Sequence, residues 1–318
     1  MPDPVLFSIV IPNWNGAHHL PICLNALRAQ TYPCFEIIVA DNASTDQSMT
    51  RLRNDYPEVK VVELPTNRGF TGACNAGIRV ATGTYVALLN NDTEVDPNWA
   101  AAVVGCFERH PEAGFVASKM LLFDRRDHLH TAGDFYRVDG QAGNRGAWQR
   151  DDGQFDTETY VFSACGGSSV YRRSLLDEVG LLDDDFFFSL EDMDLAWRAQ
   201  MKGWRCVYAP DAVVYHHLAA TGGGTTASFY DGRNAIYLLV KDYPGPLWRK
   251  YWSRILRQQG HVAWEAIRAW RGAAARARLR GMIAGLIRIP WLLLTKRRSV
   301  QKSRRVTIEY LETVLSHD

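Results

Sequence analysis

The segment LLNNDTEVD, residues 88–96, places two amides and a carboxylate directly after an apolar run. Asn90, Asn91 and Asp92 follow a stretch rich in strand-forming residues. A carboxylate is a hard oxygen ligand that Mg²⁺ or Mn²⁺ prefers, and a single one suits a metal that also binds phosphate oxygens. Because Asn and Asp also favour turns, these three residues alone leave a strand-ending turn and a cation site equally open.

A second group of acids stands in SLEDMDLAWRA, residues 189–199. The apolar spacing that follows predicts a short helix from about Asp192 that ends at Gly203. Asp192 is a candidate general base, because a carboxylate within hydrogen-bond reach can take the proton of an attacking hydroxyl. Glu191 would orient Asp192 or the acceptor, whereas Asp194 lies two positions further along the helix and faces another side. The simpler alternative is that these acids only complement the helix dipole.

Expected strands and helices, which would position these acids, alternate along the first third of the chain. Four apolar runs are expected as strands: FSIVI, FEIIVA, VKVVELP and TYVALLNND. The segments between them have helical spacing, so the pattern predicts an α/β fold with a mostly parallel sheet covered on both faces. Ligands bind outside the carboxyl ends of the strands in such sheets.

Polar residues follow all four expected strands, at positions 13–15, 41–42, 67 and 90–92. Four polar strand ends at one edge of a sheet predict a polar cleft rather than four unrelated turns. The sequence contains neither GxxxxGK[ST] nor GxGxxG between a strand and a helix. This absence argues against a P-loop nucleotidase and against a standard dinucleotide oxidoreductase.

The composition agrees with a folded protein of reducing surroundings. The 318 residues are 47% hydrophobic, which suffices for a large core. None of the six cysteines forms a CxxC pair, so reduced buried thiols of a cytosolic protein are expected. No basic segment precedes the first apolar run, and no signal peptide is therefore predicted.

Charge is distributed unevenly along the chain. Residues 245–318 contain 16 Lys/Arg and 4 Asp/Glu and carry +12, whereas residues 1–244 carry −11. Trp and aliphatic residues recur at helical spacing in this basic tail, and its segment MIAGLIRIPWLLL is too short to span a bilayer. The tail is therefore expected to lie on a membrane surface, with a packing extension or homodimer arm as the alternative. No known nucleic-acid module is recognisable, and no nucleic-acid partner is expected.

Five motifs in order resemble the family 2 glycosyltransferases of GT-A fold: SIVIPNWNG, IIVADNASTDQS, NRGFTGACNAGI, YVALLNNDTEVDP and FFFSLEDMDLAWRAQMKGW. Together with GRN at 232–234 they span roughly residues 7 to 235, and within the family they are most similar to rhamnosyltransferase-like enzymes of bacterial envelope glycans. The resemblance implies inverting transfer of a sugar, with rhamnose one candidate, from a TDP-, UDP- or GDP-sugar to a glycan or lipid-linked acceptor. It also implies a divalent cation, Mg²⁺ or Mn²⁺, and work at the inner face of the plasma membrane.

The resemblance assigns roles to individual residues. Those implied to bind the donor are Pro12, Asn13, Trp14, Asn15, Asp41, Asn67, Gly69, Asn75, Asn90, Asn91, Asp92 and Arg233. Asp92 and His216 are implied as metal ligands, with Asp192 and Glu191 as catalytic acids. Two departures weaken the pattern, since Asn90 replaces the first acid of the DxD motif and Ala219 stands where a serine often follows the histidine. The run Gly222–Gly224 is expected as a loop over the donor.

The expected organisation is a GT-A domain over residues 1–244 and a basic amphipathic helical extension over residues 245–318. The nucleotide-binding part would end near residue 120, and residues 121–244 would bind the acceptor. Two other functions stay open on the sequence: a nucleotide-sugar-binding scaffold without catalysis, and a nucleotidyltransferase that forms sugar nucleotides. The latter would need a basic glycine-rich phosphate loop near the N-terminus, which PNWNGAHH does not supply.

Overall fold

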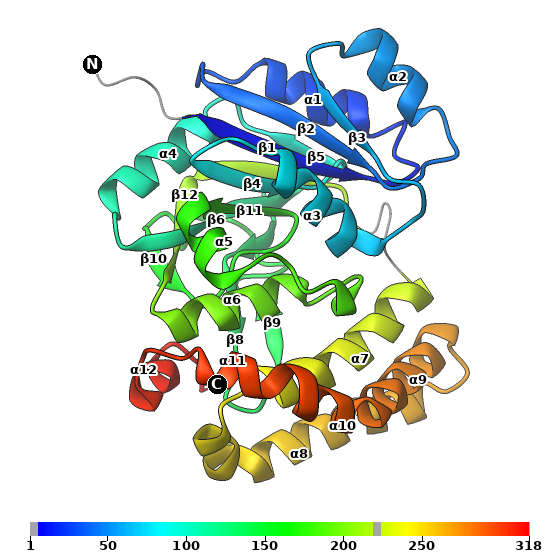
Figure 1. The fold of residues 1–318 in the computed structure, drawn as a ribbon, viewed down its shortest axis with the longest axis vertical. Coiled ribbons are helices and arrows are strands. Elements are labelled where there is room, and N and C mark those ends of the chain that lie inside the picture. Colours follow the sequence, from blue (N-terminus) through cyan, green and yellow to red (C-terminus); the bar gives the residue numbers. More distant parts are fainter. Residues whose placement is uncertain (1–5, 219–223, 318) are drawn as a thin grey trace.

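The computed structural model describes residues 6–218 and 224–317. A central sheet carries helices on both faces, and further helices from the C-terminal part lie beneath it (Figure 1). The first third alternates strands and helices as predicted: β1 (Phe7–Asn13), α1 (Leu20–Arg28), β2 (Phe35–Asp41), α2 (Ser48–Asp55), β3 (Lys60–Glu63), α3 (Gly69–Val80) and β4 (Tyr85–Leu89).

The middle third contains several short strands, two long strands and the helix that carries the second group of acids. Its elements are β5 (Thr93–Val95), α4 (Trp99–Arg109), β6 (Ala113–Leu122), β7 (Leu129–Ala132), β8 (Asp134–Tyr136), β9 (Ala142–Asn144), β10 (Thr159–Val161), β11 (Ser168–Arg172), α5 (Arg173–Val179), the 3₁₀ turn η1 (Asp184–Phe186), α6 (Glu191–Lys202) and β12 (Arg205–His216). The predicted stop of α6 is confirmed, because Gly203 caps this helix in the left-handed conformation, with φ of 95°.

The main sheet has the strand order β10-β12-β6-β11-β4-β1-β2-β3. Strands β4, β1, β2 and β3 run parallel to one another, as does the pair β6 and β12, while β11 is antiparallel to both of its neighbours. The sheet is therefore mixed and mostly parallel, as expected of the GT-A fold. β5 and β7 extend its edge, and β8 pairs with β9 in a separate small sheet.

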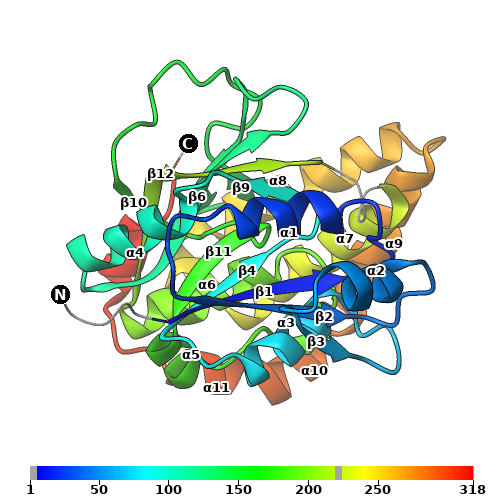
Figure 2. The same cartoon turned by 90° about the horizontal axis from the view of Figure 1, so that it is seen from above.

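Alternating side chains of β1 supply both faces of the sheet. Phe7, Ile9 and Ile11 belong to a buried cluster with α1 and α4, which Figure 2 shows across the near face of the sheet. Val10 points to the opposite cluster, where α3, α5 and α6 pack. Burial on both faces explains why these strands read as continuous apolar runs.

The C-terminal part is helical: α7 (Gly224–Lys241), α8 (Gly245–Arg268), α9 (Ala273–Ile287), α10 (Ile289–Leu292), the π-helical turn η2 (Leu293–Arg297), α11 (Arg298–Lys302) and α12 (Ile308–Thr313). None of the helices in the described part of the chain combines the length and the hydropathy that a bilayer-spanning segment needs. The core beneath α6 continues into this region, because Leu247, Tyr251, Ile255 and Leu311 belong to the same buried cluster as Trp197. The core is thus continuous across residue 244.

Candidate active site

A cleft of about 810 Å³ opens beyond the carboxyl ends of β1, β2 and β4. Both predicted groups of acids line it, although about one hundred residues separate them in sequence. The predicted site residues in its wall are Pro12, Asn13, Trp14, Asn67, Gly69, Asn90, Asn91, Asp92, Glu191, Asp192 and His216. The polar strand ends therefore lie together at one edge of the sheet, and they share the cleft with apolar side chains such as Phe70 and Phe187.

Hydrogen bonds join the strand ends to one another. Asn91 Nδ2 donates to Asn13 Oδ1 at 2.7 Å, and Asn13 Nδ2 donates to Asp41 Oδ1 at 2.9 Å. Beside them, Asn42 Nδ2 donates to Asn67 Oδ1 at 2.9 Å. Asp41 is buried beneath Asn13 and is not in the cleft wall. Its carboxylate therefore fixes the Asn13 side chain, one layer below the surface that a donor would meet.

Two further residues assigned to the donor also lie outside the cleft wall. Asn15 Oδ1 accepts from the backbone N–H of Thr45 at 2.7 Å and so joins two loops. Asn75 donates to the carbonyl of Leu182 and accepts from the backbone N–H of the same residue. A third hydrogen bond runs from Asn75 Nδ2 to Asp184 Oδ1 at 2.7 Å, and the three together fasten α3 to the start of η1, so Asn75 supports the cleft rather than lining it.

His216, at the end of β12, lies beside Asp92. Its Nε2 is 3.2 Å from Asp92 Oδ1, and its Nδ1 is 3.1 Å from His130 Nδ1. Burial lowers the pKa of His130 to about 3, so His130 is neutral, and one of the two Nδ1 atoms donates a hydrogen bond to the other. When His216 carries its hydrogen on Nδ1, its Nε2 lone pair is free to bind a metal beside Asp92; in the other tautomer Nε2–H donates to the Asp92 carboxylate.

Asn90 adds an oxygen to this group. Its Oδ1 is buried and has no hydrogen-bond partner among the described residues, although its Nδ2 is 3.5 Å from His216 Nε2. Carboxylate, amide oxygen and imidazole together suit Mg²⁺ or Mn²⁺. The residues at this position therefore fit the divalent cation that the resemblance implies.

Asp192 lies at the start of α6, across the cleft. Its carboxylate accepts from the backbone N–H of Gly166 at 2.8 Å and from that of Met193 at 2.7 Å. Burial raises its pKa in spite of these hydrogen bonds. Burial, with a smaller contribution from the Asp192 charge, also raises the pKa of Glu191 well above its usual range. A carboxylate with a raised pKa in a cleft is a stronger proton acceptor than one in water.

Asp134 and Cys165 complete a second group around Asp192. One ligand atom from each of the three residues lies within 4.8 Å of the other two, so the group could hold a metal. Burial, assisted by the Asp192 charge, raises the pKa of Asp134 to about 8, and burial raises the pKa of the Cys165 thiol well above its usual range. Both must lose a proton before they bind a cation, which makes this group the poorer fit at neutral pH.

The loop between η1 and α6 has an unusual backbone. Phe187, Ser189 and Leu190 all have positive φ, at 63°, 66° and 63°. Such conformations cost about 1–3 kcal/mol each for residues other than glycine, so surrounding contacts must impose them. The loop lines the cleft and leads directly into Glu191 and Asp192.

Helix α7 supplies the contacts that hold this loop. Asn234 Nδ2 lies within 3.1 Å of the carbonyl oxygens of Phe186, Phe188 and Ser189. Arg233 donates to the carbonyls of Asp185 and Phe186, both at 2.7 Å. We call Arg233 and Asn234 the loop clasp. The structure thus places the Arg233 guanidinium on the loop carbonyls and outside the cleft wall, which favours a supporting role over the predicted contact with the donor diphosphate.

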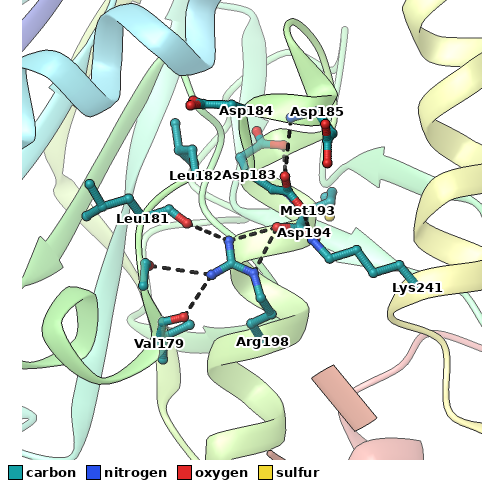
Figure 3. Close-up of polar contacts among 12 residues, drawn as sticks. Val179, Leu181, Leu182, Asp183, Asp184, Asp185, Met193, Asp194, Arg198 and Lys241 are labelled. Atoms are coloured by element: carbon teal, nitrogen blue, oxygen red, sulfur yellow. Dashed lines mark hydrogen bonds and ion pairs between the residues drawn. The ribbon is translucent and has the colours of Figure 1, made fainter. Parts of the chain in front are cut away.

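Asp194 is held in an ion network behind the cleft. Figure 3 shows the Arg198 guanidinium between the Asp194 carboxylate and the backbone carbonyls of Val179 and Leu181. Lys241 contacts Asp194 from α7. Burial opposes a charge here, yet Arg198 and Lys241 hold the pKa of Asp194 below its usual range. Asp194 is therefore ionised and paired with Arg198 and Lys241, which supports the expectation that it is a less suitable base than Asp192.

Several residues of the cleft were not anticipated from the sequence. The most relevant are Phe70, His130, Asp134, Trp148, Cys165, Gly166 and Phe187. The glycine pair in SACGGSS, just before β11, was a readable signal for a close backbone approach. Asp134 and His130 gave no such signal, because they lie in the short strands β8 and β7, whose pairing is visible only in three dimensions. The expected donor loop Gly222–Gly224 lies outside the described residues except for Gly224, the first residue of α7.

Comparison with known proteins agrees with this geometry. Residues 8–180 match the sequence model described as Glycosyl transferase family 2. An N-acetylglucosaminyl-diphospho-decaprenol L-rhamnosyltransferase of Mycobacterium tuberculosis is 26% identical over 268 residues, which cover 77% of this chain and 87% of the relative.

Two solved structures are similar in fold. The mannosyltransferase PcManGT from Pyrobaculum calidifontis, in complex with GDP-Man and Mn²⁺, has a TM-score of 0.56 at 18% identity and covers 97% of this chain and 85% of its own. GalNAc-T7 with UDP, GalNAc and Mn²⁺ has a TM-score of 0.61 at 16% identity, covering 78% of this chain and 50% of its own. The family match spans more than half of the chain, and the fold agrees with it. The chain therefore belongs to glycosyl transferase family 2 and transfers a sugar from a nucleotide-sugar donor.

Proposed function

We propose that the enzyme inverts the anomeric centre as it moves a sugar, with rhamnose the first candidate, to a hydroxyl of a cell-envelope glycan or lipid-linked acceptor. The observation that carries this proposal is the meeting of two acidic groups in one cleft. Asp92 lies at the strand edge and Asp192 at the start of α6, and both line the same space. The activity for which the mycobacterial relative is named supports the choice of sugar and of a lipid-linked acceptor.

The residues at the carboxyl ends of the strands would bind the nucleotide diphosphate. Pro12, Asn13 and Trp14 would contact the base, and Trp14 is 46% exposed in the wall, free to stack on it. Asn67 and Gly69 would contact the ribose and the diphosphate. Three further residues would act from behind the cleft wall by fixing the loops that carry the donor-binding residues: Asp41, Asn15 and Asn75. An assay with TDP-, UDP- and GDP-sugars would identify the donor nucleotide.

Asp192 would accept the proton of the acceptor hydroxyl as that oxygen attacks the anomeric carbon. Attack from the side opposite to the leaving diphosphate inverts the configuration, and the transition state has oxocarbenium character. Asp192 is held for this task by the N–H groups of Gly166 and Met193, and its pKa is raised by burial. Glu191 would orient the acceptor from the neighbouring position.

Asp92 and His216, with the oxygen of Asn90, would hold a divalent cation. When bound there, Mg²⁺ or Mn²⁺ would neutralise charge on the leaving diphosphate as a Lewis acid. His130 supports the arrangement through its contact with His216 Nδ1 at 3.1 Å. The absence of the first acid of DxD, replaced by Asn90, predicts weaker metal affinity than two carboxylates would give.

The proposed setting is the cytoplasmic face of the plasma membrane, where a lipid-linked acceptor would be presented. The basic tail of +12 charge supports peripheral attachment.

Screening a panel of TDP-, UDP- and GDP-sugars with Mn²⁺ tests the proposal. We expect one donor to be hydrolysed slowly without acceptor and transferred rapidly with a lipid-linked glycan, giving the inverted anomer by NMR. Tight binding of a donor with no turnover on any acceptor would favour a non-catalytic scaffold instead. Release of a nucleoside triphosphate from donor and pyrophosphate would favour a nucleotidyltransferase.

A further inference from the structure

Helix α8 has one buried face and one apolar face that the protein leaves uncovered. Its buried residues are Leu247, Tyr251, Ile255 and Ala266. On the other side, the exposed apolar residues are Trp252, Leu256, Trp264 and Ile267, each more than half accessible. At 100° per residue, these four project within an arc of about 120°. Such a stripe on a helix surface usually faces a partner.

The helix that follows repeats the pattern. Ile283, Leu286 and Ile287 of α9 stand at i, i+3 and i+4, and Ile287 is 72% exposed. Leu294 in η2 is 82% exposed, and Trp270 in the turn between α8 and α9 is also exposed. Helix α9 packs against α8, so the two helices form a hairpin. A run of exposed Trp, Leu and Ile on one hairpin exceeds the scattered apolar side chains of an ordinary surface.

Unpaired cations accompany these apolar side chains. Arg249, Arg257, Arg271 and Arg280 are exposed, and none of the four has an ion-pair partner among the described residues. They contribute to the +12 charge of residues 245–318. Exposed Trp and Leu beside unpaired arginines match the composition of helices that lie in a membrane interface.

We propose that this surface docks on an anionic lipid bilayer. We call it the tail face and define it by Trp252, Leu256, Trp264, Ile267, Trp270, Ile283, Leu286, Ile287, Leu293 and Leu294 with the four unpaired arginines. A second copy of the chain fits the surface less well. A twofold dimer through this face would set the same unpaired arginines of both copies against each other, whereas anionic headgroups neutralise them.

The position of the tail face suits a lipid-linked acceptor, and in that respect the inference rests on the proposed function. Helix α7 packs against α9, and residues of α7 at the cleft include Thr226 and Asp231. Figure 1 shows α8 and α9 at the end of the molecule opposite to α1 and α2, with α7 between them and the sheet. Docking through α8 and α9 would hold the acceptor side of the cleft toward the bilayer.

Co-sedimentation of the full chain with vesicles tests the inference without any sugar donor. Vesicles of phosphatidylglycerol and phosphatidylcholine should bind the protein, and vesicles of phosphatidylcholine alone should bind it weakly. Ile287→Ser should lower the partition coefficient about three- to tenfold, because an inserted side chain is lost. Ile22→Ser is the matched control, since Ile22 is 36% exposed on α1, away from the tail face; it should bind as the wild type does.

Charge reversal tests separately the electrostatic contribution of the unpaired arginines to vesicle binding. Arg257→Glu and Arg271→Glu should each lower binding to anionic vesicles by at least about fivefold. Equal binding of wild type and a triple variant, Trp252→Ser with Trp264→Ser and Ile287→Ser, would overturn the proposal. It would also be overturned if this variant changed a dimer into a monomer without affecting lipid binding, because a second copy would then cover the face. Donor hydrolysis in solution should be the same in all variants, so a failed lipid assay leaves the proposed transferase activity standing.

Discussion

The loop clasp makes Asn234→Ala the most informative single substitution. Asn234 offers two N–H donors to three carbonyl oxygens, those of Phe186, Phe188 and Ser189, so one donor is shared. Removing it loses about 1 kcal/mol for each net hydrogen bond and leaves buried carbonyls unpaired at about 1–3 kcal/mol. The expected local cost is about 2–4 kcal/mol, which is comparable to the strain of one or two positive-φ residues.

That cost should appear mainly in catalysis, because the loop can relax without unfolding the sheet. Relaxation would displace the start of α6, and a shift of about 1 Å at a catalytic group can cost on the order of 10²-fold in rate. We therefore expect kcat for transfer to fall about 10- to 100-fold. The dissociation constant of the nucleoside diphosphate should change little, since the strand edge that would bind it does not involve α7.

Transfer kinetics, nucleotide titration calorimetry and thermal unfolding together decide the outcome. Asn54→Ala, at an exposed position in α2, is the matched control and should behave as wild type. Arg233→Ala should resemble Asn234→Ala, with kcat reduced and nucleotide affinity retained. If Arg233→Ala instead weakened nucleotide diphosphate binding strongly, the guanidinium would be a phosphate ligand and the clasp would be refuted. If the two variants had an unchanged kcat but a lower thermal stability, the loop clasp would contribute to stability and not to catalysis.

The remaining predictions concern the acids of the cleft. Asp92→Ala, or excess EDTA, should each reduce transfer severely in the donor assay; full activity in EDTA would exclude the metal role. Asp192→Asn should lower kcat by ~10²–10⁴ because the amide cannot accept a proton, while calorimetry finds the donor affinity unchanged; a collapse of donor affinity would make it a binding residue. Asp134 has its pKa raised from 3.8 to about 8 by burial, so the folded chain keeps a proton that the unfolded chain releases. Wild-type stability should consequently fall as pH rises from about 4 to 8, and Asp134→Asn should be more stable by on the order of a few kcal/mol at pH 8, with the difference vanishing toward pH 4 in urea unfolding.

The donor side of the cleft could be predicted because its residues follow regular strands. Apolar runs with polar ends specify both the strand and the edge where its last residues stand, so the strand pattern is enough to predict that Asn13, Asn67 and Asp92 lie together. The strand pattern did not show how deep each polar side chain lies beneath the cleft surface. Sequence position cannot tell whether a polar side chain such as Asp41 faces the cleft or the layer beneath it.

The acceptor side could be predicted only at its two acids. Phe187, Ser189 and Leu190 adopt positive φ against their own preferences, which no propensity argument anticipates. The support that Arg233 gives to the loop was not predicted for a related reason: arginine suits a diphosphate and a set of backbone carbonyls equally well, and only the fold shows that the carbonyls are within reach. Asp134 forms an isolated β-bridge with Ser163, three residues before the Gly166 that donates to Asp192, and this long-range contact has no local signature.

Ion pairs and core contacts of residues 245–318 determine whether this tail can be removed without disturbing the rest of the protein. Asp183 lies just before η1 and pairs with Lys241 at 2.6 Å and with Lys296 of η2 at 3.1 Å. Lys296 also pairs with Asp185 at 2.7 Å, so the tail holds the segment that leads to Asp192. A chain cut after residue 244 would lose the ion pairs of Lys296 together with Leu247, Tyr251 and Ile255 of the common core. Such a truncation would disturb catalysis and membrane binding at once, because the tail supports the catalytic loop on one side and presents the tail face on the other. Substitutions on the exposed face are therefore the way to test the two roles apart.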